Sequence, residues 1–75
     1  MPAGEFFFVI ARGRRSTSRA DRVYSSVVGW VRPDHDQKSH NHPSYLTLQK
    51  ANAVAADFRE HRPDFDVWVI KPEEY

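Results

Sequence analysis

The stretch "EFFFVIAR", residues 5–12, decides the fold that we expect for this chain. It joins three phenylalanines to valine and isoleucine between Gly4 and Gly13, and it is too short for a typical helix. Its alternating side chains are apolar on both sides, as in a strand whose two faces are both covered. We therefore predict that these residues form the central strand of a sheet.

Two further strands are expected along the chain. "RVYSSVVGWVR", residues 22–32, is rich in strand-forming residues and ends at Pro33, which has no N–H to donate to a ladder. Its simplest partner is the 5–12 strand, through an antiparallel hairpin. "DVWVIK", residues 66–71, is the third strand predicted.

From Thr47 the apolar residues change to helical spacing, which predicts an amphipathic helix. Thr47 can cap this helix, or Ser44 if it begins one turn earlier, and Pro63 stops it near His61. The apolar positions that define its inner face are Leu48, Ala51, Val54, Ala55 and Phe58.

The resulting order is β-β-α-β in a single small α+β domain of residues 1–75. A right-handed crossover predicts a three-stranded antiparallel sheet of order 2-1-3, with the helix packed on one face. One helix covers one face only, so either the loop of residues 33–46 or a partner must cover the other. Pairing two such sheets face to face, or joining their edge strands across a two-fold axis, would bury several aromatic side chains, which predicts a homodimer with Trp30 or Trp68 at or near its interface.

Length and composition limit the class of protein. The 75 residues include no cysteine, so neither a disulfide nor a zinc–thiolate site can compensate for a small core. The apolar run near the N-terminus, residues 6–11, is too short for a membrane span or a signal peptide. We therefore expect a cytoplasmic protein that has no membrane partner.

Charge is distributed unevenly along the chain. Residues 1–50 carry eight Lys/Arg against four Asp/Glu, a balance of +4, whereas residues 51–75 carry three against six, a balance of −3. The densest basic segment, residues 12–22, has five arginines opposed only by Asp21. Guanidinium groups interleaved with hydroxyls can hold phosphate or carboxylate groups, so this segment is a candidate anion-binding element. The binding residues predicted are Arg12, Arg14, Arg15, Arg19, Arg22, Trp30 and Trp68.

The segment "PDHDQKSHNHP", residues 33–43, has histidines at a spacing that could supply ligands to Zn²⁺ or Ni²⁺. A polar loop assures neither a rigid scaffold nor hydrogen-bond partners that orient each imidazole. We therefore expect His35, His40 and His42 to be mostly exposed, with no metal or other cofactor bound. The sequence also has no nucleophile elbow and no phosphate-binding loop, so we expect no enzymatic activity.

Most of the chain consists of four stretches, "FFFVIARG", "VVGWVRPD", "SYLTLQKANAVAADF" and "RPDFDVWVIKP". Their overall pattern resembles that of small accessory proteins of unknown function from bacteriophages, especially those of high-GC hosts. The resemblance implies action by binding, without chemistry of its own. The function expected is a non-enzymatic protein-binding module that binds or inhibits a host, phage or defence protein. The alternative is a small nucleic-acid-binding protein that uses the arginine-rich hairpin tip.

Overall fold

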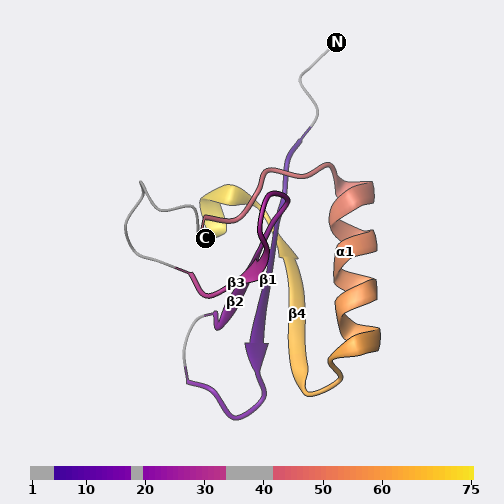
Figure 1. Cartoon of the computed structure of the whole chain (residues 1–75). Coiled ribbons are helices and arrows are strands. Elements are labelled where there is room, and N and C mark those ends of the chain that lie inside the picture. The colour runs from indigo at the N-terminus through magenta and orange to yellow at the C-terminus, as the bar shows by residue number, and fades with distance from the viewer. Residues whose placement is uncertain (1–4, 18–19, 34–41) are drawn as a thin grey trace.

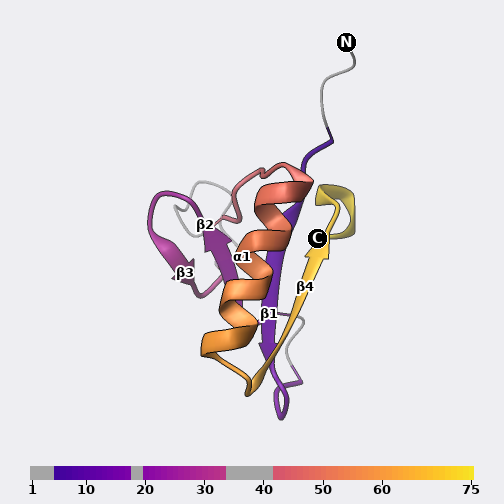
Figure 2. The same ribbon diagram turned by 90° about the vertical axis from the view of Figure 1, so that its right-hand side faces the viewer.

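The computed structural model describes residues 5–17, 20–33 and 42–75 and shows an α+β arrangement of one helix and a four-stranded antiparallel sheet. Helix α1 lies across one face of the sheet (Figures 1 and 2). The elements are β1 (Phe8–Gly13), β2 (Arg22–Ser25), β3 (Gly29–Val31), α1 (Leu48–His61), β4 (Phe65–Ile70) and the short 3-10 helix η1 (Pro72–Glu74).

The sheet has the order β3-β2-β1-β4, and each neighbouring pair is antiparallel. The predicted α+β class, antiparallel sheet and helix are confirmed. The predicted three-stranded sheet of order 2-1-3 and the element order β-β-α-β are wrong, because the run expected to form one strand over residues 22–32 forms two. The apolar strand β1 nevertheless lies between β2 and β4, where both of its edges are paired.

A three-residue turn breaks the strand that was expected over residues 22–32. Residues 26–28 form this turn and connect Ser25 to Gly29, which pair in the β2–β3 ladder. Gly29 has a φ of 83°, a left-handed conformation that glycine adopts at little cost and that often follows the turn in hairpin loops of this length. Val27 is β-branched and therefore favours a strand in the sequence pattern. In the structure it lies in the turn and is 87% exposed, so it does not contribute to the core.

Helix α1 begins and ends close to where the sequence predicts. The side-chain oxygen of Thr47 accepts a hydrogen bond of 3.3 Å from the backbone N–H of Lys50, and the last helical residue, His61, comes shortly before Pro63. Leu48 is half-exposed in the first turn, whereas the other predicted inner positions are buried. The buried helix residues are Ala51, Val54, Ala55 and Phe58.

Within the described ranges, no helix has the length and apolar character needed to cross a bilayer.

On the face of the sheet opposite α1, the area around Phe8 is covered by segments that form neither a strand nor a long helix. Phe8 is 2% exposed, and its ring lies 5.4 Å from the ring of His42, 4.8 Å from Tyr45 and 5.6 Å from Tyr75, measured between centroids. Pro43 is also fully buried. The end of the 33–46 loop and the residue after η1 therefore fill this part of the face, and no second copy of the chain is needed to bury Phe8.

Residues 42–46 are also tied to the sheet by backbone hydrogen bonds. The N–H of Ser44 donates to the carbonyl of Tyr24 at 2.9 Å, and Leu46 exchanges two bonds of 2.7 and 3.0 Å with Phe7. These bonds connect the segment to β2 and to the residue before β1. The surface left for the predicted homodimer is therefore the uncovered part of this face, where Trp68 is 37% exposed.

Candidate binding surface

The arginine-rich connection between β1 and β2 lies at the end of the sheet remote from η1 (Figure 1). Asp21 organises it, because the backbone N–H of Gly13 donates to one carboxylate oxygen at 2.7 Å and the hydroxyl of Ser16 donates to the other at 2.8 Å. These two hydrogen bonds, the first above all, stabilise the charged carboxylate and lower the pKa of Asp21. The acid that the sequence places among the arginines therefore shapes the segment that carries them.

Arg12 lies on the sheet face opposite α1, beside Trp68. The β1–β4 register pairs Arg12 with Asp66, and Trp68 comes two residues further along the same face. The guanidinium carbon of Arg12 consequently lies 5.3 Å from the centroid of the Trp68 ring, within the range of a cation–π contact. The structure thus brings a predicted cation and a predicted aromatic residue into contact on an accessible surface.

Arg14 and Arg59 extend this surface, since both line an open depression of about 360 Å³ together with Trp68. The Nε atom of Arg14 lies 3.8 Å from a carboxylate oxygen of Asp66, and Arg59 donates to the carbonyl of Val67 at 2.8 Å. We call Arg12, Arg14, Arg59 and Trp68 the arginine–tryptophan surface. The remaining residues that line the depression are Pro63, Phe65, Asp66 and Val67.

Arg59 was not among the predicted binding residues. It is not one of the apolar residues that define the predicted inner face of α1, and nothing in the sequence indicates that it reaches the edge strand β4. Its position follows from the packing of α1 beside β4, which brings the helix side chain to the carbonyl of Val67. Sequence periodicity identifies the face of a helical residue but not the neighbouring strand that it meets.

The other predicted binding residues are spread over the molecule. Arg15 is exposed, Arg19 lies outside the described residues, and Arg22 donates to the backbone carbonyl of the preceding residue at 2.8 Å. Trp30 is partly buried on the α1 side of the sheet, where its ring stacks on Phe58. Of the predicted set, the structure brings together Arg12, Arg14 and Trp68.

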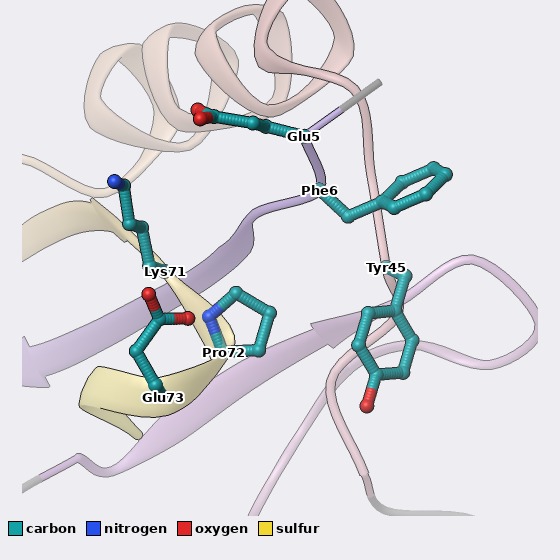
Figure 3. Close-up of a pocket in the computed structure, with 6 residues that line it drawn as sticks. All are labelled: Glu5, Phe6, Tyr45, Lys71, Pro72 and Glu73. Atoms are coloured by element: carbon teal, nitrogen blue, oxygen red, sulfur yellow. The ribbon is translucent and has the colours of Figure 1, made fainter. Parts of the chain in front are cut away.

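A second depression, of about 280 Å³, lies where the segment before β1 meets η1, at the end of the sheet away from the arginine-rich connection (Figures 1 and 3). Phe6 and Tyr45 are 46% and 61% exposed there, and neither was predicted as a binding residue. We call it the Phe6–Tyr45 depression. Its lining residues are Glu5, Phe6, Tyr45, Lys71, Pro72 and Glu73.

The predicted histidine cluster falls only partly within the described residues. His35 and His40 lie outside them, whereas His42 is exposed, as predicted, and its ring lies perpendicular to that of Phe8. The Nδ1 atom of His42 lies 2.9 Å from the carbonyl oxygen of Pro43, a distance that suits a donated hydrogen bond. The described part of the chain has no group of three His, Cys, Asp or Glu residues placed to hold a metal ion.

No family model, curated protein or solved structure matches this chain. The resemblance to bacteriophage accessory proteins therefore stays a prediction.

Proposed function

We propose that this chain is a non-enzymatic protein-binding module whose arginine–tryptophan surface takes an acidic segment of a partner protein. The observation that carries the proposal is the guanidinium of Arg12 at 5.3 Å over the partly exposed ring of Trp68. Arginine and tryptophan are among the residues most enriched where binding energy concentrates at protein interfaces. An aromatic ring beneath Arg12 also restricts its conformations before binding, which reduces the entropy lost on binding.

The state of Arg14 supports an anionic partner. Its side chain is 68% exposed and that of Asp66 is 48% exposed, and the 3.8 Å between them is longer than a short charge-assisted hydrogen bond. Exposed ion pairs of this kind contribute about 0–1 kcal/mol, so a carboxylate from a partner can replace Asp66 at little cost. Arg15, which follows in the chain, is also exposed and adds a further guanidinium for such a partner.

We further propose that the protein is an accessory protein of the kind that bacteriophages encode, and that it binds or inhibits a host or defence protein in the cytoplasm. The sequence resemblance supports this proposal. The composition supports it as well, because a chain without cysteine depends on packing and not on disulfides, which suits a reducing compartment.

Single-stranded nucleic acid is the second candidate partner, because arginines beside an accessible aromatic ring also contact phosphates and stack bases. The position of Arg12 favours a carboxylate over a base. Its guanidinium already lies over the Trp68 ring, so a base stacking from that side would have to displace it. A carboxylate would bind the guanidinium where it stands.

Tryptophan fluorescence can test the proposal. In a Trp30→Phe background Trp68 becomes the only tryptophan, and its emission should change when a short glutamate-rich peptide binds. Arg12→Gln should weaken this binding about fivefold or more, whereas Lys50→Gln, which removes an exposed cation of α1 outside the surface, should not.

Oligothymidylate serves as the competing probe in the same titration. Binding of oligothymidylate but not of the peptide, with an affinity that falls steeply with salt, would favour the second candidate. If neither probe changes the emission of Trp68, the proposed surface is wrong.

A further inference from the structure

We propose that the Phe6–Tyr45 depression is a second binding site, and that it takes a proline-containing basic segment of a partner protein. This site is separate from the arginine–tryptophan surface, and the proposal does not depend on the function of that surface. It rests on the rigidity of two exposed aromatic rings, on the size of the depression and on the charges at its rim.

The two rings are exposed but held in place. Phe7 and Leu46, which follow Phe6 and Tyr45 in the chain, exchange two backbone hydrogen bonds. The Tyr45 ring packs at 4.8 Å against that of the buried Phe8, and the Phe6 and Tyr45 rings meet edge-on, with centroids 6.4 Å apart and planes at 88°. Aromatic side chains whose backbone is already fixed lose little conformational entropy when a partner binds them.

The size of the depression favours a peptide over a small-molecule cofactor. Its volume of about 280 Å³ lies just below the roughly 300–1,000 Å³ of typical ligand pockets, and it is open to solvent. A pocket of this kind can take one or two side chains of a longer segment but does not enclose a cofactor. The rest of such a segment would lie outside the depression.

The apolar half of the depression suits proline. It is formed by Phe6, Tyr45 and Pro72, and Pro72 lies between the Tyr45 ring and the charged residues (Figure 3). Aromatic-lined grooves bind proline-rich segments because a polyproline II chain is extended before binding and loses little entropy. The apolar pyrrolidine ring of proline can then pack on the exposed faces and edges of the two aromatic rings.

The charged half of the depression suits a cation. Glu5, Lys71 and Glu73 lie on the side away from the two aromatic rings (Figure 3). A carboxylate oxygen of Glu74 accepts a hydrogen bond from the backbone N–H of Lys71 at 3.2 Å, which brings a third acid close to the rim. Three carboxylates and one ammonium give a negative balance, so arginine or lysine next to the bound proline would be attracted.

The test is a titration of the ¹⁵N-labelled protein, followed by NMR, with a synthetic peptide that alternates proline and arginine. The amide signals of Phe6, Leu46 and Lys71 should shift saturably. At these amides, peptides with alanine for proline, or with glutamate for arginine, should show an affinity at least about fivefold weaker, whatever the glutamate peptide does at the arginine–tryptophan surface. Arg12→Gln should leave the affinity unchanged, which separates this site from the arginine–tryptophan surface.

Protein variants complete the test. Phe6→Ala should weaken binding at least about fivefold, whereas Val27→Ala, which truncates another exposed apolar residue that does not line the depression, should have no effect. If Phe6→Ala loses the signal dispersion of a folded protein, the double variant Glu5→Gln/Glu73→Gln replaces it. That variant should bind the arginine peptide more weakly than the wild type does, and its affinity for the glutamate peptide should not fall.

Three results would overturn the proposal. The first is the absence of shifts at these amides, and the second is equal binding of the proline and alanine peptides. The third is a shift of the same amides on concentrating the protein alone, lost in Phe6→Ala, since the occupant would then be a second copy of the chain.

Discussion

Trp30 of β3 stacks on Phe58 of α1, with ring centroids 4.0 Å apart and planes inclined by 25°. The Trp30 ring also meets Tyr24 on the neighbouring strand β2 at 5.6 Å, and Phe58 meets Phe65 of β4 at 5.5 Å. Four rings thus form a continuous row between the helix and the sheet, from one outer strand to the other. The row links both edges of the sheet to α1.

Removing the ring of Trp30 should destabilise the protein more than its edge position indicates. Trp30→Ala should lower the free energy of unfolding by about 3 kcal/mol, the lower end for buried aromatic residues, because Trp30 is only partly buried. Val27→Ala, in the exposed turn of the same hairpin, should change it by no more than about 0.5 kcal/mol. Urea denaturation followed by circular dichroism measures both free energies. Equal effects of the two substitutions would contradict the stabilising role of the row of rings.

Asp21→Asn should remove part of the acid dependence of stability. The hydrogen bonds from Gly13 and Ser16 lower the pKa of Asp21 in the folded protein below its ordinary value of 3.8. The carboxylate therefore contributes stability that is present above this value and is lost as the pH falls through the lowered folded pKa. Thermal unfolding at several pH values should show a steeper acid loss for the wild type than for Asp21→Asn, and parallel curves would refute the role of Asp21.

His61 should titrate above its ordinary pKa of 6.5. Its Nδ1 atom is hydrogen-bonded to the backbone carbonyl of Asp57 at 2.8 Å, and the nearby Asp57 carboxylate adds to the raised pKa. The resulting stability is fully present below 6.5 and is lost as the pH rises through the higher folded pKa. NMR titration of the His61 ring protons should place the midpoint above 6.5. Asp57→Asn, which keeps the carbonyl, should remove only part of the shift, and a wild-type midpoint at or below 6.5 would contradict this account.

Neutralising the arginine-rich connection should separate binding from folding. The triple variant Arg14→Gln/Arg15→Gln/Arg19→Gln should keep its melting temperature nearly unchanged, because the Arg14–Asp66 pair is exposed and weak. Its affinity for the glutamate-rich peptide should fall severalfold, since the guanidinium of Arg14, which lines the depression with Trp68, is lost together with two further positive charges of the same segment. A folded triple variant that binds as tightly as the wild type would assign these residues to solubility alone.

The histidines of the 33–46 loop should not form a zinc site. His42 already packs against Phe8 and lies within hydrogen-bond distance of the Pro43 carbonyl, which engages one of its two ring nitrogens. Calorimetric titration with zinc should therefore show no stoichiometric binding with a Kd below about 1 μM. Tighter binding that disappears in His40→Ala/His42→Ala would show that the loop assembles a ligand set.

The sequence by itself determined those elements that depend on interactions between residues close together in the chain. The unbroken apolar run of residues 6–11 indicated a strand with both faces covered, and β1, which is paired on both edges, contains most of this run. The helix could be predicted from its period, its cap at Thr47 and the stop before Pro63, because each depends on neighbours within one or two turns. The arginine cluster was visible as composition alone.

Only the tertiary structure decided how distant segments meet. The turn at residues 26–28 interrupts residues that favour a strand, and the cover of Phe8 comes from segments with no period of their own. The contact of Arg12 with Trp68 depends on the β1–β4 register, and a slip of one residue would turn Trp68 to the helix side. Register and packing are set by the burial of the whole core at once, which no single stretch of the sequence specifies.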